Sequence, residues 1–333
     1  MKKIRLHNNE SPFTPESLCK ELLDFDLSQA RLNYYQSQEE GSLIEALSEY
    51  TGLDKEMIVV ANGGDTLLSE IFNSLTGDNR KMLVSTPTFF LYLSTAKKLR
   101  LNLIDIPLKE GFKLPTSEII KRVNEEEIGL VVICRPNNPT GNIFPKEDIL
   151  EIAEKTNANI LVDEAYFEFA KETLTDELYN YKNIIILRTF SKAFAAAGLR
   201  LGYGLGSKEI VKKVRDYQTH YNVSNITQMI GTKLLSNKDL FLPYVEKIIE
   251  LRESFRDKLN EIEGVYVYPS NTNFLLVKTE KDPELLEEYF NDKNVLIRPV
   301  HKLSPLIKDT IRVSVADEQT NQKFVNLLAD YIN

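Results

Sequence analysis

The sequence predicts an α/β fold, with a large domain built on a mostly parallel central sheet sandwiched by helices and a smaller α+β domain. Two observations predict it. In the middle of the 333-residue chain, short apolar runs alternate with longer amphipathic stretches, a pattern typical of helices covering a parallel sheet. In the last third, one long charged amphipathic stretch over 240–262 precedes several short apolar segments, which indicates an α+β arrangement.

The alternating part divides into strands and helices in chain order. The apolar runs predict strands at 57–60, 81–85, 101–106, 130–134, 160–162 and 184–188. The stretches between them predict helices at 65–75, 90–98 and 145–155. Since ligands bind at the carboxyl edge of such sheets, the loops after the strands are the places to look for chemistry.

The last third predicts a second, smaller unit. Short apolar segments predict strands at 266–268, 274–277, 295–297 and 311–315, with helices near 283–290 and at the end of the chain. Turn residues near 236–239 mark the break. The first 25 residues are irregular, and we expect them to return to this unit. We therefore predict a large domain over 26–236 and a small domain formed by 1–25 and 237–333.

Composition excludes several classes of protein. The net charge is -8, so the basic footprint of a nucleic-acid binder is missing. Cys19 and Cys134 are too few and too far apart for a disulfide framework, and no Cys/His cluster predicts a metal site. Cys134 lies in an apolar run, which favours a buried structural thiol. The amino-terminal residues resemble no signal peptide and no apolar run could span a membrane, so we expect a cytoplasmic protein with no membrane partner.

A lysine follows the strand at 184–188. In the run Thr189-Phe-Ser-Lys-Ala-Phe-Ala-Ala-Ala-Gly-Leu-Arg200, Lys192 stands in a turn flanked by small residues. A lysine that attacks a carbonyl to form a Schiff base must be held rigidly and kept from full hydration, so that its amine can be neutral. Ser191 and Arg200 could offer a hydroxyl and a guanidinium to a phosphate. The alternative is an ordinary surface lysine in a loop.

Two loops after earlier strands add to this pattern. Asn62-Gly-Gly-Asp65 joins a strand to a helix, and its glycines and free helix amides suit a phosphate; the alternative is a plain turn with an N-cap. Pro136-Asn-Asn-Pro-Thr-Gly141 is a loop stiffened by prolines that could aim Asn138 at a ligand; the alternative is a rigid turn with local bonds only.

The fourth segment is Val162-Asp-Glu-Ala-Tyr166, at the end of another strand. Asp163 could pair with a protonated ring nitrogen, because a carboxylate stabilises the charged form of such a group. Tyr166 could donate a hydrogen bond to a phenolate oxygen. The alternative is an exposed acidic turn.

In their order and intervals, the four segments resemble the fold-type I aminotransferases that use pyridoxal-5′-phosphate (PLP), and within that fold the histidinol-phosphate aminotransferase family. The resemblance runs from about residue 6 to the end of the chain. It is strengthened by the segments Leu6-His-Asn-Asn-Glu-Ser-Pro12, Tyr34-Tyr-Gln-Ser37, Ser85-Thr-Pro-Thr-Phe-Phe-Leu-Tyr92, Tyr221-Asn-Val-Ser224 and Ile311-Arg-Val-Ser-Val315.

The resemblance implies roles for individual residues. Lys192 resembles the Schiff-base lysine and proton carrier, and Asp163 the partner of the pyridine nitrogen. The resemblance implies that Asn138 and Tyr166 bind the phenolic oxygen of the cofactor and that Phe89 stacks on its ring. The residues implied to bind the cofactor's phosphate are Gly64, Asp65, Ser191 and Arg200, with Tyr35 at the phosphate of the neighbouring subunit. The residues implied to bind the substrate are Asn9, Arg298 and Arg312. The implied protein is a homodimer with shared active sites, which transfers an amino group between an amino acid, or histidinol phosphate, and a 2-oxo acid in histidine biosynthesis.

Departures from the family lie on the substrate side. His7 stands where the family often has asparagine, Arg135 where it has a neutral residue, and family members usually carry further amino-terminal residues that include an aromatic side chain. The alternatives that remain open are a decarboxylase of the same fold resembling threonine-phosphate decarboxylase, an aromatic amino-acid aminotransferase, and a non-catalytic binding protein descended from this fold.

Overall fold

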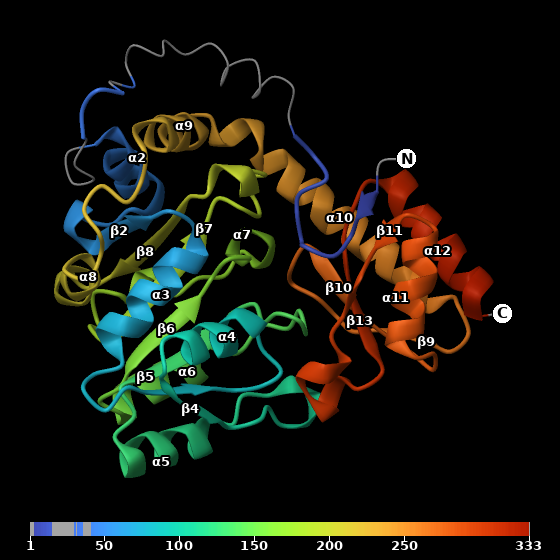
Figure 1. Cartoon of the computed structure of the whole chain (residues 1–333), viewed down its shortest axis with the longest axis horizontal. Coiled ribbons are helices and arrows are strands. Elements are labelled where there is room, and N and C mark those ends of the chain that lie inside the picture. Colours follow the sequence, from blue (N-terminus) through green and yellow to red (C-terminus); the bar gives the residue numbers. More distant parts are fainter. Residues whose placement is uncertain (1–2, 15–29, 31, 36–40, 333) are drawn as a thin grey trace.

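The computed structural model describes residues 3–14, 30, 32–35 and 41–332, which form two lobes (Figure 1). The larger lobe contains a seven-stranded sheet in the order β2-β8-β7-β6-β5-β3-β4. Only β8 runs antiparallel to its two neighbours, and all other pairs are parallel. The prediction of an α/β fold with a mostly parallel central sheet is therefore confirmed.

Six strands of this sheet lie where the apolar runs predict them. They are β2 (Ile58–Ala61), β3 (Lys81–Val84), β4 (Asn102–Asp105), β5 (Leu130–Cys134), β6 (Asn159–Asp163) and β7 (Ile184–Thr189). The seventh, β8 (Gly202–Gly206), was not predicted, because three of its five residues are glycines, which weaken a strand. Packing requires one of them: a Cβ on Gly202 would lie 2.7 Å from the Gly64 nitrogen.

Helices cover both faces of the sheet. Side chains of α3 (Gly64–Leu75), α4 (Phe90–Lys98) and α8 (Lys208–Arg215) pack with one set of alternate strand residues. Side chains of α2 (Ser42–Thr51), α5 (Thr116–Glu126), α6 (Lys146–Lys155) and α9 (Asn225–Ser236) pack with the other set. In β5, for example, Val132 belongs to the first cluster and Val131 to the second. The central strands are therefore buried on both faces, which explains their continuous apolar runs.

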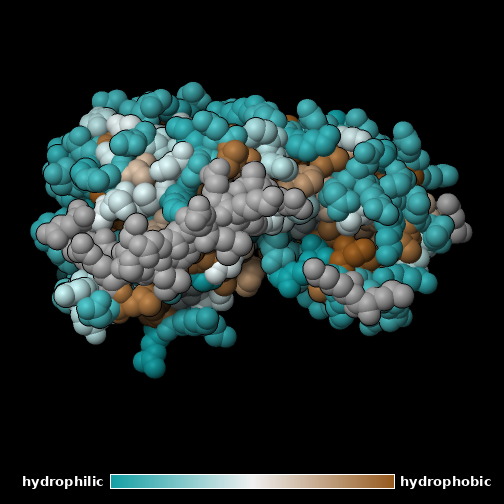
Figure 2. Space-filling view, turned by 90° about the horizontal axis from the view of Figure 1, so that it is seen from above, coloured by the Kyte–Doolittle hydropathy of each residue, from teal (hydrophilic) through white to brown (hydrophobic). Residues whose placement is uncertain are grey.

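The smaller lobe is built on a four-stranded antiparallel sheet in the order β12-β13-β10-β9. Its strands are β9 (Val265–Val267), β10 (Phe274–Thr279), β12 (Arg298–Pro299) and β13 (Thr310–Ser314). The long predicted helix is α10 (Leu242–Asn260), and α11 (Pro283–Asp292) and α12 (Glu318–Ile332) complete the lobe. Seen from above, the two lobes have mainly hydrophilic surfaces (Figure 2).

The amino-terminal segment returns to the smaller lobe. Strand β1 (Ile4–Arg5) pairs in parallel with β11 (Val295–Leu296), and the Ser314 amide donates a hydrogen bond to the Leu6 carbonyl. Residues 15–25, the rest of the segment expected here, lie outside the described residues. We propose the division into 26–236 and 1–25 with 237–333 as two domains, because it keeps each sheet within one unit.

Two kinds of feature are absent from the described residues. None of their helices is long and apolar enough to cross a membrane. They also contain no group of three or more His, Cys, Asp or Glu side chains placed to hold a metal ion.

Candidate active site

A cavity of about 530 Å³ opens at the carboxyl edge of the large sheet, where residues of the smaller lobe close it from the other side. It is lined by the ends of β5, β6 and β7, by the start of α3 and by the amino-terminal segment. Of the predicted site residues, only Tyr35 lies elsewhere. The others all line the cavity: Asn9, Gly64, Asp65, Phe89, Asn138, Asp163, Tyr166, Ser191, Lys192, Arg200, Arg298 and Arg312.

Lys192 lies in the turn after β7, with its side chain half-buried at the cavity. Its ammonium donates hydrogen bonds to the backbone carbonyls of Asn8 at 3.0 Å and Asn9 at 3.2 Å. Burial lowers the pKa of Lys192 to about 8, and the nearby Arg312 adds to this effect. A considerable fraction of the amine is therefore neutral at moderately alkaline pH, as a nucleophile or proton carrier requires.

Asp163 is the last residue of β6 and is buried. The Tyr92 hydroxyl donates a hydrogen bond of 2.5 Å to its Oδ2, and the Ala165 amide donates one of 3.0 Å to its Oδ1. Burial raises the pKa of Asp163 to about 6, whereas these two hydrogen bonds lower it. The carboxylate therefore remains largely ionised at neutral pH and can stabilise a positive charge in the cavity.

Tyr166 and Asn138 come together next to Asp163, and both are buried. The Tyr166 hydroxyl accepts hydrogen bonds from Asn9 Nδ2 at 3.0 Å and Asn138 Nδ2 at 3.4 Å. The predicted pair for a phenolic oxygen thus lies together in the cavity, joined by Asn9 from a distant part of the chain. Asn9 is held by Ser314, whose hydroxyl accepts from its backbone amide at 2.9 Å.

The start of α3 forms a cradle at one end of the cavity. The N-cap residue Gly63 has no side chain to cap the helix, so the first amides of α3 keep free N–H groups. Gly63 has φ +91°, and a Cβ there would lie 2.6 Å from Arg200 Nη2. Arg200 Nη2 also donates to Asp65 Oδ2 at 3.4 Å. Ser191 and Thr189 hydroxyls add donors on the same side, so the cradle combines amides, hydroxyls and a guanidinium.

Phe89 lies between the strand-end loop after β3 and α4, and its ring lines the cavity. It packs edge-to-face against Tyr92, with ring centroids 5.6 Å apart. A half-buried ring fixed in this way offers its free face to a flat ligand.

Two arginines of the smaller lobe face the cavity. Arg298 in β12 and Arg312 in β13 are directly opposite each other in the antiparallel register. Arg312 is buried; its guanidinium donates to Asn138 Oδ1 at 2.7 Å and to the His7 carbonyl at 2.6 Å, and its buried Nε has no partner. Burial lowers the pKa of Arg312 to about 10, and Arg298 contributes. Within the described residues Arg298 forms no ion pair, so this end of the cavity has an uncompensated positive charge.

Tyr35 is largely exposed, at 82%, and stacks on Tyr221 with ring centroids 4.7 Å apart. It does not line the cavity of its own chain. Its predicted role, at the phosphate of a neighbouring subunit, remains a prediction.

Among the residues to which the sequence assigned no role, Tyr92 contacts a site residue and Cys134 lines the cavity. Tyr92, fully buried in α4, contacts Asp163; in the sequence it is one more aromatic residue in an amphipathic helix. Cys134 was predicted as a purely structural thiol. It is buried as predicted, but it also lines the cavity, because β5 ends there.

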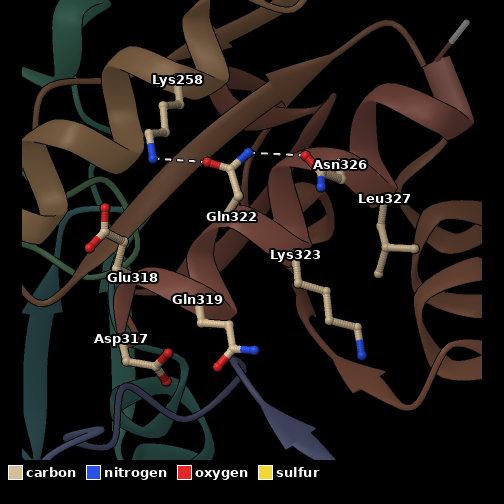
Figure 3. Close-up of a pocket in the computed structure, with 8 residues that line it drawn as sticks. All are labelled: Lys258, Asp317, Glu318, Gln319, Gln322, Lys323, Asn326 and Leu327. Carbon is tan, nitrogen blue, oxygen red and sulfur yellow. Dashed lines mark hydrogen bonds between the residues drawn. The ribbon is translucent and has the colours of Figure 1, made fainter.

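A larger depression of about 820 Å³ lies on the surface between α10 and α12 (Figure 3). Its polar side chains bond one another: Lys258 Nζ donates to Gln322 Oε1 at 2.8 Å, and Gln322 Nε2 donates to Asn326 Oδ1 at 3.0 Å. It contains no buried charge directed at a ligand, so the smaller cavity between the lobes is the candidate active site.

Comparisons with known proteins agree on one family. The family model of aminotransferase class I and II matches residues 1–328. A histidinol-phosphate aminotransferase of Ruminiclostridium cellulolyticum is 35% identical over 96% of this chain and 90% of its own length.

Solved structures have the same fold. The histidinol-phosphate aminotransferase of Clostridium acetobutylicum superposes with a TM-score of 0.89, at 25% identity and with 99% of each chain covered. The histidinol-phosphate aminotransferase of Sinorhizobium meliloti, solved in complex with PLP, gives a TM-score of 0.88 at 24% identity, over 99% of this chain and 91% of that one.

Proposed function

The chain belongs to the aminotransferase class I and II family and is a PLP-dependent aminotransferase, and from this premise we propose that its amino donor is histidinol phosphate and its acceptor a 2-oxo acid. This reaction would place it in histidine biosynthesis. The relative at 35% identity carries this activity in its name. The arrangement of the two arginines in this chain supports the same substrate.

The cavity fits PLP, a flat pyridine ring with a phosphate at one side. The cradle at the start of α3 suits the phosphate, because no side chain caps the first amides of the helix and the Arg200 guanidinium lies beside Gly63. We propose that the cradle residues Gly64, Asp65, Ser191 and Arg200 hold the phosphate, Phe89 stacks on the ring, Asp163 pairs with the ring nitrogen, and Asn138 and Tyr166 bind the phenolic oxygen.

When bound, PLP supplies an electron-withdrawing ring that stabilises negative charge at the substrate carbon bearing the amino group. Lys192 would hold the cofactor covalently and, once displaced, move a proton at that carbon; its lowered pKa suits both tasks. Asp163 would keep the ring nitrogen charged, and Tyr166 would orient the phenolic oxygen.

The observation that carries the substrate proposal is the arginine pair. Like charges directly opposite on neighbouring strands destabilise a sheet unless an anion lies between them. Arg298 and Arg312 are such a pair, and the Nε of Arg312 is buried without a partner. In histidinol phosphate, a phosphate ester replaces the carboxylate of an amino acid next to the reacting carbon. Its two negative charges and several acceptor oxygens match two guanidinium groups better than a single carboxylate does.

A panel of donors tests the proposal. The holoenzyme is mixed with histidinol phosphate, histidinol, glutamate or phenylalanine, and the change in absorbance of the bound cofactor is followed over a single turnover. We expect histidinol phosphate to react with the highest kcat/KM of the four donors. Histidinol is the matched control, because it differs only by the phosphate.

Other outcomes would identify the alternatives. A faster reaction with phenylalanine would indicate an aromatic amino-acid aminotransferase. Release of carbon dioxide from phosphothreonine, without amino transfer, would indicate a decarboxylase. If none of the four donors reacted, histidinol phosphate would not be the donor, and only the family assignment would stand.

We further propose that the enzyme acts in the cytoplasm as a homodimer. Tyr34, Tyr35 and Tyr221 are exposed aromatic residues on one side of the large lobe, as expected for a surface that a second copy covers. In such a dimer Tyr35 would reach the phosphate in the partner's cavity, in keeping with its distance from the cavity of its own chain.

A further inference from the structure

Tyr92 contacts a residue of the proposed mechanism, Asp163, but has no role in that mechanism so far. It lies in the first turn of α4 and is fully buried. Its ring packs edge-on against Phe72 and Phe89, with centroid distances of 6.4 Å and 5.6 Å. This packing fixes the ring, so the hydroxyl has one position.

The hydroxyl of Tyr92 donates to Asp163 Oδ2 at 2.5 Å, whereas Oδ1 accepts the Ala165 amide at 3.0 Å. Each carboxylate oxygen can accept two hydrogen bonds, so one position on each oxygen is taken by the protein and the other stays available. The two donors together fix the plane of the carboxylate. A hydrogen bond of this length to a charged acceptor is a strong one.

We propose that Tyr92 is a positioning residue that holds the Asp163 carboxylate ionised and in a fixed orientation toward the ring nitrogen of the cofactor. The inference rests on the pairing of Asp163 with that nitrogen. Its basis is geometric: a fully buried hydroxyl has a carboxylate oxygen as its hydrogen-bond acceptor, and that carboxylate lines the cavity.

The effect of Tyr92 has a definite sign. Burial raises the pKa of Asp163, and the Tyr92 hydrogen bond is the largest influence that lowers it. Besides Tyr92, the titratable groups that interact with Asp163 include Cys134, Asp65, Tyr166 and Lys192. Without the hydroxyl, Asp163 becomes more basic and competes with the ring nitrogen for their shared proton. The ring would then withdraw electrons less strongly.

The variant Tyr92→Phe tests this, because it keeps the ring packing and removes only the hydroxyl. The holoenzyme is prepared with PLP labelled with ¹⁵N in the ring, and the nitrogen resonance is followed against pH. We expect the resonance to move toward the unprotonated position. In the cofactor-free protein, the Asp163 carboxyl, followed by ¹³C NMR, should titrate at higher pH than in the parent.

Kinetics provide a second readout. In Tyr92→Phe we expect kcat to fall by about ten- to a hundredfold, the loss that corresponds to one hydrogen bond to a charged group. KM should stay nearly unchanged, because no substrate contact is lost. Tyr203→Phe is the matched control. Tyr203 is also fully buried, but it does not line the cavity, so we expect parent-like behaviour.

An unchanged nitrogen resonance together with an unchanged Asp163 titration in Tyr92→Phe would overturn the proposal. If Tyr92→Phe does not fold, 3,5-difluorotyrosine at position 92 replaces it. This residue is a stronger donor, so the Asp163 titration should move to lower pH, and no movement would be equally decisive. Both spectroscopic readouts need no amino donor. A failure of histidinol phosphate as substrate is therefore distinguishable from a failure of this inference.

Discussion

At the residue scale, burial sets the protonation of three groups around one cavity. It lowers the pKa of Lys192 to about 8, raises that of Asp163 to about 6 and lowers that of Arg312 to about 10. In each case burial disfavours the charged form, and neighbouring groups modify the shift. At pH values between the pKa of Asp163, about 6, and that of Lys192, about 8, Asp163 is mostly ionised and Lys192 is mostly protonated but easily deprotonated.

The shifted pKa of Lys192 predicts how the cofactor is attached. Only the neutral amine is nucleophilic, so the rate of attachment of PLP to the cofactor-free enzyme should rise with pH through about 8 and then level off. Stopped-flow absorbance measures this rate, and reduction with borohydride followed by mass spectrometry identifies the lysine. A rate that is flat between about pH 6 and pH 10, or a label on another lysine, would refute the assignment.

The arginine pair predicts two different losses. Arg312→Ala should lower kcat/KM for both histidinol phosphate and glutamate, by an amount that corresponds to ~2–5 kcal/mol of lost binding free energy, because a buried charged partner is removed. Arg312→Lys should recover little of this loss. Arg298 is exposed, so Arg298→Ala should cost roughly fivefold, and mainly with the phosphorylated donor.

The control for these variants is Arg256→Ala, an arginine of α10 that lies outside the cavity and pairs with Glu253 and Asp257. It should leave the steady-state kinetics unchanged. If Arg298→Ala and Arg312→Ala also behave like the parent with every active donor, the two arginines are structural and the substrate is bound elsewhere.

At the scale of elements, the site depends on where strands end. β5, β6 and β7 finish at Cys134, Asp163 and Thr189, so the loops that follow deliver their side chains to one edge. α3 follows β2 in the chain, and its first residues, Gly64 and Asp65, line the cavity at the same edge. Here Gly63 combines a positive φ with close contact to Arg200.

This cradle predicts a specific effect of Gly63→Ala. The added Cβ would displace the Arg200 guanidinium, so PLP affinity should fall about tenfold or more, measured by titration of the cofactor-free enzyme. Gly264→Ala is the control, since Gly264 has a similarly positive φ of +78° but nothing within 4 Å of the added carbon. It should cost stability of about 1 kcal/mol, through backbone strain alone, and leave PLP affinity unchanged. Equal affinities in the two variants would rule out the cradle.

The sequence predicted the elements whose residues have a clear period or an uninterrupted apolar run. It therefore located the strand ends and, through them, most of the residues that line the cavity. It did not predict β8, where Gly202 is required by the close approach of α3. It also did not predict the helices α2, α5, α8 and α9; in α5 and α8 a few apolar residues lie among charged ones. The contact between Tyr92 and Asp163 was also not predictable, because it joins residues 71 positions apart through tertiary packing.

At the scale of the whole molecule, the two lobes share the site, and we expect a second copy to complete it. Tyr35→Ala and Lys192→Ala should each be nearly inactive as homodimers. Mixed dimers formed by co-refolding should regain activity, since one of their two sites then combines an intact lysine with an intact tyrosine. With random pairing, about a quarter of the parent activity is expected. Sedimentation establishes the dimer, and a monomer with full activity, or no recovery on mixing, would contradict shared sites.

The bond from the Asn9 amide to Ser314 also bears on the order of events during synthesis. Asn9 leaves the ribosome 305 residues before Ser314, and the contact between them holds Asn9 against Tyr166. The large sheet, which ends at Gly206, can pair its strands well before that. A nascent chain can therefore assemble most of the phosphate end of the cavity while the substrate end is still untranslated, so the ability to distinguish substrates arises only after Ser314 has been synthesised.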